Sequence, residues 1–356
     1  MRVLFITRKF PPITGGMEKY SRELYDALSG QARVDLFANR KGNKALPFFL
    51  IAAVAKLLVA GRRYDIIHLG DGLLGILIPI ARACGGAAVT ITIHGLDVTY
   101  ANPVYRAVVV PRIRTADRVI CVSRNTRRLC LDRGISADKI SVIPNGITSD
   151  AGADVVAARP SSLRSVVDEG GILCTIGRLV KRKGHEWFIR EVMPRLDASY
   201  SYLIAGDGPE RPALERAIVA CGLRERVFLL GLISEGEKEW LLRAARLFIM
   251  PNIPVSGDVE GFGLVLTEAA TRGLMSVASD IDGIPDAVVP GETGNLARPL
   301  DADSFVTAIE SARPDRDRVK AAVAVFDWKR IAARYISEMR KAHDIVTSDR
   351  SRRHRT

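Results

Sequence analysis

The chain has 356 residues, of which 47% are hydrophobic and 26% charged. That length exceeds one ordinary hydrophobic core and suits two domains. The net charge of +12 is uneven, because residues 1–160 carry 23 basic and 12 acidic side chains, whereas residues 161–349 carry 25 and 28. The basic first half therefore favours an acidic partner such as nucleic acid, an anionic membrane or a phosphorylated acceptor.

The five cysteines are odd in number and never spaced as C-x-x-C. This usage is typical of reduced, buried thiols and argues against a disulfide framework or a cysteine-bound metal. The first residues read directly as a strand, without the basic, apolar and small-residue regions of a signal peptide. We therefore expect a cytoplasmic protein.

Short β-branched runs alternate with helical stretches, which predicts parallel sheets with crossover helices. The strands expected in the first half are Val3–Thr7, Val34–Ala38, Asp65–Leu69, Val89–His94, Arg118–Val122 and Ile140–Pro144. Those expected in the second half are Ile172–Ile176, Tyr202–Ala205, Val227–Leu230, Leu247–Met250 and Met275–Ala278. Two such series predict an α/β fold of two Rossmann-like, doubly wound domains.

Domain boundaries follow from these series and from composition. We expect an N-terminal domain over 1–150, a linker over 151–165 rich in small residues, and a C-terminal domain over 166–325. An amphipathic helix is predicted over 326–345, followed by a basic, disordered tail over 346–356.

The loop after the first strand contains Gly15-Gly16 and then Glu18. Glycine permits positive φ and close backbone approach, and loops at the carboxyl ends of parallel strands bind ligands. The pattern is neither G-x-G-x-x-G nor a Walker loop. A simple turn is the alternative interpretation.

The most apolar segment is Lys44–Ala60, with Lys41, Arg62 and Arg63 close by. Its uninterrupted apolar part is about eleven residues, short of the roughly 20 that a membrane-spanning helix needs. The basic flanks are typical of an interfacial helix on an anionic membrane, while a buried crossover helix is the alternative.

His94 ends an expected central strand and is followed by Gly95 and Asp97. It could act as a general base, clamp a substrate or be a satisfied polar group. His68, which ends the strand before it, fits a structural role better.

In the second half, Arg178 and Lys183 lie five positions apart in a loop between a strand and a helix. A planar guanidinium and an ammonium can grip a diphosphate from two sides. A solvated basic loop is the alternative.

Glu260 and Glu268 flank a Gly-Phe-Gly turn that leads into a helix. Unpaired N–H groups at such a helix start suit a phosphate, and carboxylates accept strong hydrogen bonds from sugar hydroxyls. An ordinary surface helix with an acidic start would look similar.

Six motifs occur in order along nearly the whole chain. They are P-P-x-x-G-G-x-E, H-G-L-D, V-I-P-N-G-I, G-R-L-x-x-x-K-G, A-G-D-G-P, and E-G-F-G-L-x-x-x-E followed by S-D-I-D-G-I-P-D. Together they resemble the retaining glycosyltransferases of family 4, which have the GT-B fold of two domains facing across a cleft.

The resemblance implies that a nucleotide-sugar donor binds mainly on the second domain. Arg178 and Lys183 would bind its diphosphate, Glu260 the sugar hydroxyls and Glu268 the ribose. Backbone N–H groups of Phe262, Gly263 and Leu264 would contribute to sugar or phosphate. On the other domain, Gly15 and Gly16 would face the donor phosphate and His94 the donor sugar, with Gly16, Glu18 and Asp97 on the acceptor side. The final helix would return to the first domain.

The family also implies that no cofactor or metal is needed and that transfer proceeds on one face, with the donor phosphate taking the acceptor proton. Some positions depart from the family pattern: Met275-Ser276 replaces the usual Pro-Val, Thr148 stands where Asp is frequent, and Asn252–Val259 is a longer loop. These departures concern which sugar is held.

The sequence therefore predicts a retaining hexosyltransferase that uses a UDP- or GDP-sugar and a lipid-linked or envelope-glycan acceptor, with a peripheral position on the inner face of the plasma membrane as one interpretation. A nucleotide-sugar epimerase of the same architecture is the alternative enzyme. A nucleic-acid-binding protein is the non-enzyme alternative, but aromatic residues are only 6%, so we expect no nucleic-acid partner.

Overall fold

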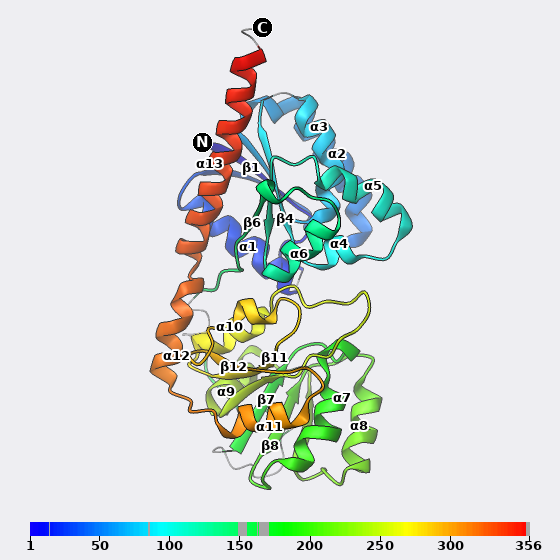
Figure 1. Ribbon diagram of the computed structural model, residues 1–356, viewed down its shortest axis with the longest axis vertical. Helices are drawn as coiled ribbons and strands as arrows, with labels where there is room; N and C mark the ends of the chain where they lie inside the picture. The colour runs from blue at the N-terminus through cyan, green and yellow to red at the C-terminus, as the bar shows by residue number, and fades with distance from the viewer. Residues whose placement is uncertain (14, 85, 149–154, 162, 164–170, 354–356) are drawn as a thin grey trace. The chain divides into compact units, whose positions relative to one another are not determined.

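The computed structural model describes residues 1–13, 15–84, 86–148, 155–161, 163 and 171–353. The chain divides into two compact units (Figure 1). The first unit contains residues 1–148, 260–262 and 326–356, and the second contains residues 149–259 and 263–325. Most of the predicted linker over 151–165 lies outside the described residues.

The first unit is built on a sheet of six parallel strands in the order β2-β1-β3-β4-β5-β6. The strands are β1 (Arg2–Thr7), β2 (Arg33–Ala38), β3 (Ile66–Leu69), β4 (Ala88–Ile93), β5 (Arg118–Cys121) and β6 (Ile140–Val142). All six predicted strands are present within two residues of the expected ends. The central strands β3 and β4 are buried along their whole length, as parallel strands covered by helices on both faces are.

Helices cover both faces of this sheet. They are α1 (Gly16–Ser29), α2 (Leu46–Ala60), α3 (Ile78–Ala83), α4 (Leu96–Thr99), α5 (Pro103–Ile113), α6 (Arg124–Asp132) and α13 (Trp328–Arg353). The helices α2, α3, α5 and α6 pack on one face and share one hydrophobic core, whereas α1 and α13 lie on the other (Figure 1).

The C-terminal helix α13 belongs to the first unit and buries Trp328, Ile331, Tyr335 and Met339 along one side. The prediction of a disordered tail from residue 346 is wrong for residues 346–353, because α13 continues to Arg353. Side chains near its end bond back to the preceding turn, as Thr347 does to the carbonyl oxygen of His343. Residues 354–356 lie outside the described residues.

The apolar segment of the first unit forms α2, and Asn43–Arg63 as a whole is helical, long enough and apolar enough to span a membrane by length and composition alone. Four of its side chains, Phe49, Ala53, Leu57 and Ala60, are nevertheless buried in the core of the first unit. Phe49 also stacks on Phe37 of β2. This packing is that of a crossover helix, and a spanning position would remove it from the sheet.

The second unit is a sheet of six parallel strands in the order β12-β11-β10-β7-β8-β9. Its strands are β7 (Ile172–Ile176), β8 (Ser201–Ala205), β9 (Val227–Gly231), β10 (Leu247–Met250), β11 (Ser276–Ser279) and β12 (Gly294–Ala297). The five predicted strands are confirmed. The sixth, β12, was missed because the sequence Gly-Asn-Leu-Ala has little β propensity, and only its pairing with β11 extends it.

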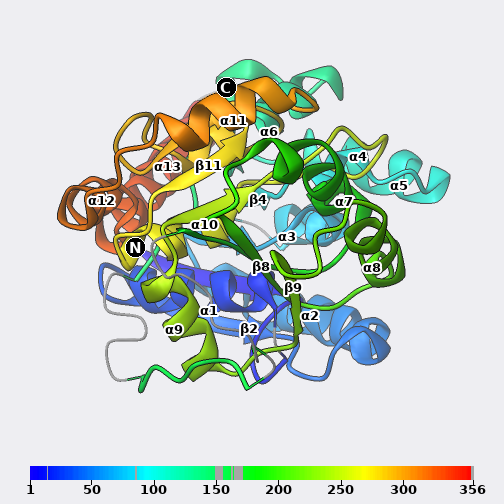
Figure 2. The same ribbon diagram turned by 90° about the horizontal axis from the view of Figure 1, so that it is seen from below.

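Helices again cover both faces of the second sheet. They are α7 (His185–Trp187), α8 (Arg211–Ala220), α9 (Glu235–Ala244), α10 (Leu264–Thr271), α11 (Ala302–Glu310) and α12 (Arg316–Val323). Figure 2 shows α7, α8 and α11 on one side of the sheet and α9, α10 and α12 on the other.

Short 3-10 turns occur in both units, at Asn43–Ala45, Gly61–Arg63, Gly72–Leu77, Ala137–Lys139, Lys181–Lys183, Met193–Arg195, Ile284–Ala287 and Ala324–Phe326. A π-helical turn occurs at Phe188–Val192.

Candidate active site

In each sheet there is one point at which the order of adding strands reverses, so that later strands extend the opposite edge of the sheet. In the first sheet this point lies between β1 and β3, and in the second between β7 and β10. Open parallel sheets bind ligands at the carboxyl ends of the strands beside such a point. Most of the predicted site residues follow these strands or a direct neighbour: Gly15 and Gly16 after β1, His94 and Asp97 after β4, Arg178 and Lys183 after β7, Glu260 and Glu268 after β10.

His94 is held in a defined orientation at the end of β4. Its backbone N–H donates to Oδ2 of Asp97 at 2.8 Å, and its Nε2 lies 3.2 Å from the carbonyl oxygen of Gly70. Because a carbonyl oxygen only accepts, Nε2 carries the proton and Nδ1 presents a lone pair. Burial lowers the pKa of His94 to about 4. The ring is therefore neutral at pH 7 and suited to accept a hydrogen bond.

A buried group of charges connects the loops that follow β1, β3 and β4. Arg8 Nε donates to Asp71 Oδ1 at 2.7 Å. Burial alone would lower the pKa of Arg8, but the charges of Asp71 and Asp97 outweigh it and the pKa is raised. Burial raises the pKa values of Asp71 and Asp97, and the positive charge of Arg8 opposes this rise. Sequence reasoning missed Arg8 and Asp71, although each lies within two residues of the end of a strand.

Two polar atoms of this charged group, Asp71 Oδ2 and Tyr105 Oη, are buried and have no hydrogen-bond partner within the described part of the chain. Burial and the neighbouring Asp97 and Asp71 also raise the pKa of Tyr105. A hydroxyl that remains protonated beside two carboxylates can donate a hydrogen bond, so the group keeps unused donor and acceptor capacity.

Gly15 and Gly16 stand at the start of α1, with Gly15 as the cap residue. Glu18 is buried there, and a Cβ added to Gly15 would collide with the Glu18 carboxylate. Lys9 Nζ pairs with Glu18 Oε1 at 3.2 Å. Glu18 thus covers the start of its own helix and is balanced by Lys9. Its predicted place on the acceptor side stays a prediction.

His68 has the structural role expected for it. Its Nδ1 lies 2.8 Å from Thr90 Oγ1 and its Nε2 lies 3.3 Å from Thr92 Oγ1. The network continues from Thr92 to Tyr335 of α13 at 3.3 Å and on to Tyr20 of α1 at 2.7 Å between the two hydroxyls. The Tyr20 and His94 rings pack nearly perpendicular to each other, with centroids 4.8 Å apart. The buried polar network therefore fixes the Tyr20 ring, which in turn packs against His94.

In the second unit, the loop carrying Arg178 and Lys183 packs against the turn after β8. The backbone N–H groups of Gly177 and Leu179 donate at 2.9 Å to the carbonyl oxygens of Ala205 and Asp207. Gly206 has φ +139°, and a Cβ there would collide with the carbonyl oxygen of Gly177. The A-G-D-G-P motif therefore supports the basic loop. Arg178 is exposed and Lys183 is half-buried, so both cations are within reach of a ligand.

Glu268 on α10 has a cationic partner that the sequence did not reveal. Lys238 Nζ on α9 lies 2.9 Å from both Glu268 Oε1 and Glu235 Oε2. Burial alone would lower the pKa of Lys238, but the two carboxylates outweigh it and the pKa is raised. Gly263 caps α10 and Leu264 is its first residue. The N–H group of Leu266 donates to the carbonyl oxygen of Gly263 at 2.9 Å, whereas those of Leu264 and Val265 come too early in the helix for an intrahelical partner.

Glu260 and Phe262 follow β10 in the chain and are grouped with the first unit, whereas Gly263 begins the next part of the second unit. Phe262 is buried, which leaves only its backbone to meet a ligand. Among the described residues, no group of three or more His, Cys, Asp and Glu side chains is arranged to hold a metal ion. Metal independence stays a prediction from the family resemblance.

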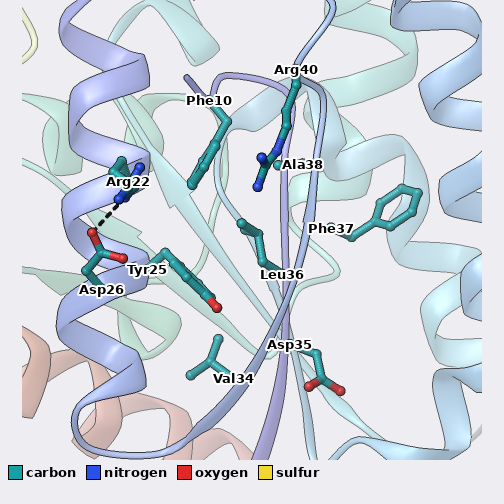
Figure 3. A pocket seen from close by; sticks show the side chains of 10 residues that line it. All are labelled: Phe10, Arg22, Tyr25, Asp26, Val34, Asp35, Leu36, Phe37, Ala38 and Arg40. Carbon is teal, nitrogen blue, oxygen red and sulfur yellow. Dashed lines mark hydrogen bonds and ion pairs between the residues drawn. The ribbon is translucent and has the colours of Figure 1, made fainter. Parts of the chain in front are cut away.

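A hollow of about 710 Å³ in the first unit lies along β2 and contains none of the predicted site residues. Val34 and Leu36 of β2 point into it with Phe10 and Tyr25, while Phe37 points to the opposite face of the sheet (Figure 3). Arg40 lies over the Phe10 ring, 5.3 Å from its centroid. We assign this hollow no part in the site.

Two doubly wound parallel sheets, each with predicted site residues after the strands beside the point where the strand order reverses, define an α/β, two-domain GT-B architecture. Residues 14–151 match the family described as Glycosyltransferase Family 4, and residues 170–313 match the family described as Glycosyl transferases group 1. The chain belongs to the family 4 glycosyltransferases.

Its relatives include a GDP-mannose-dependent alpha-(1-6)-phosphatidylinositol monomannoside mannosyltransferase of Mycolicibacterium smegmatis, 29% identical over 90% of this chain and 91% of the relative. The protein of the same description from Mycobacterium tuberculosis is 27% identical over 98% of both chains. Among solved structures, Anabaena HepE in complex with UDP has a TM-score of 0.75 at 21% identity, covering 96% of this chain and 100% of that one. Sucrose-phosphate synthase from Thermosynechococcus elongatus has a TM-score of 0.73 at 23% identity, covering 96% and 98%.

Proposed function

We propose that this protein is a retaining glycosyltransferase that moves a hexose from a nucleotide diphosphate sugar to a hydroxyl of a lipid-linked or cell-envelope glycan. GDP-mannose is the first donor to test and a phosphatidylinositol-linked glycan the first acceptor, because the relatives named above use them. The carrying observation is that Arg178 and Lys183 lie in the segment after β7, while Glu268 lies in α10, the helix that follows the adjacent strand β10.

On the donor side, Arg178 and Lys183 would bind the diphosphate and offset the charge that develops as it leaves. Preorganised positive groups aimed at a leaving diphosphate stabilise the transition state more than the ground state. Glu268, held by Lys238, would accept hydrogen bonds from the ribose hydroxyls. Glu260 would hold the hydroxyls of the sugar, and the N–H groups at the start of α10 would add donors for phosphate.

On the first unit, His94 would accept a hydrogen bond from a donor-sugar hydroxyl through Nδ1. The Nε2–H bond to Gly70 and the low pKa support this role, because they favour a neutral ring with a lone pair available. The same features argue against His94 as a general acid at neutral pH, since its protonated form is scarce there.

Retention is part of the proposal and rests on the family resemblance. In the reaction, the bond between the anomeric carbon and the diphosphate oxygen breaks, and the acceptor oxygen forms a bond to that carbon on the same face. The acceptor proton passes to the departing phosphate oxygen, so atoms and charges balance. Binding geometry and the two cations would supply most of the acceleration.

We also propose a cytoplasmic location and a reaction without a metal or other cofactor. All five cysteines are free thiols in the structure, which suits a reducing compartment. Activity unchanged by a strong chelator would support metal independence, and loss restored by one divalent cation would refute it.

The first experiment is thermal stabilisation by GDP, UDP, ADP, TDP and their sugars. A ligand that binds only the folded state stabilises it by about 2.7 kcal/mol at a hundredfold excess over its Kd. We expect a response to one base only, GDP being the first candidate. Transfer to phosphatidylinositol-linked acceptors is then measured. Proton NMR of the new anomeric centre tests whether the configuration of the sugar is retained. Release of free nucleotide and altered sugar without an acceptor would favour the epimerase alternative, and no response to any nucleotide would refute the proposal.

A further inference from the structure

Helix α2 is apolar on its outer side as well as on the side that faces the core. Its buried side chains, Phe49, Ala53, Leu57 and Ala60, form one stripe. A second stripe on the opposite side is exposed: Phe48, Ile51, Ala52, Ala55, Leu58 and Val59. The spacing of three, one, three, three and one residues is that of one continuous face of an α-helix. We call this exposed face the outer stripe.

The exposure of the outer stripe is unusual for its residue types. Phe48 is 76% exposed and Val59 81% exposed, and both Ile51 and Leu58 exceed 60%. A helix on the surface of a soluble domain normally carries polar residues on its outer side. Contiguous apolar surface of this kind marks a site of contact with a membrane or another protein.

The charges around α2 indicate which of these partners it meets. Lys41 and Lys44 precede the helix and Arg62 and Arg63 follow it, and all four side chains are exposed. The sequence from Leu36 to Tyr64 contains no Asp or Glu. Basic residues at both ends of an apolar stripe complement an anionic surface whose interior is apolar, which is the chemistry of a bilayer with acidic headgroups.

A neighbouring helix adds to the same surface. Helix α5 lies on the same face of the sheet as α2, and α3 contacts both helices. It exposes Val104 and Val108, and Tyr100 is exposed just before it. Between Asp97 and Asp117 the sequence again has no acidic residue, but it contains Arg106, Arg112 and Arg114. The apolar and basic character is thus shared by two helices of one face.

We propose that this face of the first unit docks on an anionic lipid bilayer, with α2 lying flat in the headgroup region. The outer stripe extends over about 17 Å, from the rise of about 1.5 Å per residue between Phe48 and Val59. It enters the boundary between headgroups and acyl chains, while Lys44, Arg62 and Arg63 contact lipid phosphates. The buried stripe of Phe49, Ala53, Leu57 and Ala60 stays in the core, so docking requires no unfolding of α2.

Vesicle sedimentation tests this surface without any glycosyl acceptor, so its result is independent of the proposed activity. The full-length protein is pelleted with vesicles of phosphatidylcholine alone or of an equal mixture with phosphatidylglycerol. We expect binding to the anionic vesicles that weakens between about 0.1 M and about 0.5 M salt, because the Debye length shortens. The double variant Ile51→Ser/Val59→Ser should bind at least about fivefold less, since it removes apolar area from the contact.

Two control variants make the result specific. Leu232→Ser changes a side chain that is 84% exposed in the second unit, and it should bind like the wild type. Lys44→Gln/Arg62→Gln should lose the preference for anionic lipid, whereas Arg216→Gln/Lys320→Gln, also exposed and in the second unit, should keep it. Circular dichroism verifies that each variant is folded.

Two outcomes would overturn the proposal. One is vesicle binding by Ile51→Ser/Val59→Ser equal to that of the wild type. The other is a wild-type dimer in size-exclusion chromatography with light scattering that the same variant converts to a monomer, without vesicle binding by either. That result would assign the outer stripe to a second copy of the chain.

Discussion

Asp97 Oδ2 accepts a hydrogen bond of 2.8 Å from the backbone N–H of His94, three residues earlier. This contact fixes the turn that leaves β4 and so sets where the His94 ring lies. Asp97 is buried, and burial raises its pKa. The bond gives Asp97 a positioning role, which differs from the acceptor contact that the family resemblance implies. Both roles predict loss of activity, but the positioning role also predicts that removal of the accepting oxygen destabilises the fold.

Asp97→Ala should lower kcat/KM at least about tenfold, equivalent to about 1.4 kcal/mol. It leaves the N–H of His94 without its acceptor, which should also destabilise the fold by about 1–3 kcal/mol. Asp97→Asn keeps an oxygen that can accept this bond and should retain most of the stability. Urea denaturation and steady-state kinetics measure both effects. Equal destabilisation by Ala and Asn would show that the charge facing Arg8, and not the hydrogen bond, is what matters.

Lys183→Ala and Glu260→Ala should each reduce turnover at least about tenfold, about 1.4 kcal/mol in activation free energy. Lys183 would no longer offset charge on the leaving diphosphate, and Glu260 would no longer hold the donor sugar. The matched control is Lys181→Ala, an exposed cation in the same loop. It should remain near wild-type turnover. Near wild-type turnover in both Lys183→Ala and Glu260→Ala would refute the site assignment.

Glu268→Gln should weaken binding of the nucleoside diphosphate, because a neutral amide is a poorer acceptor for ribose hydroxyls than a carboxylate. We expect at least about a tenfold rise in Kd, about 1.4 kcal/mol, with little change in kcat. Lys238→Met should have a smaller effect in the same direction, since it leaves Glu268 charged but no longer held. Isothermal titration with the preferred nucleotide gives both numbers. A larger effect for Lys238→Met than for Glu268→Gln would contradict the ribose assignment.

Much of the fold could be predicted from alternating β-branched runs, since those runs are the buried strands. β12 could not, because Gly294 and Asn295 disfavour a strand and only the edge of β11 extends them. Residues beside glycine turns, such as His94 and Arg178, could be proposed as site residues from the sequence, because the polar side chain and the turn are adjacent in the chain. Their partners were not. Arg8 and Asp71 are 63 residues apart and Lys238 and Glu268 are 30 apart, so only the folded sheet brings them together.

Gly206→Ala should strongly destabilise the second unit and disturb the loop that carries Arg178. Gly206 has φ +139°, and a Cβ would collide with the carbonyl oxygen of Gly177. Gly222→Ala is the control, because Gly222 also has positive φ, +67°, but a Cβ there would meet nothing within 4 Å. Strain alone should cost about 1–2 kcal/mol at Gly222, and the clash should make Gly206→Ala clearly worse. Similar unfolding free energies for the two variants would remove the argument for backbone packing between these loops.

Acid should destabilise the protein through buried neutral histidines. Burial lowers the pKa of His68 to about 3, and burial together with the charge of Lys183 lowers that of His185 to about 3, against 6.5 for an ordinary histidine. Between these values the unfolded chain binds more protons than the native one, so the stabilisation is complete above about pH 6.5 and is lost as the pH falls. Each histidine should cost about 1.36 kcal/mol per pH unit, roughly 2 kcal/mol at about pH 5.

His185→Phe removes one such group and leaves the 2.7 Å bond between Tyr202 and Thr175 available. Its unfolding free energy, measured by urea denaturation from about pH 8 to about pH 5, should therefore fall less steeply than that of the wild type. An identical slope in the two proteins would mean that His185 is not held neutral by the fold.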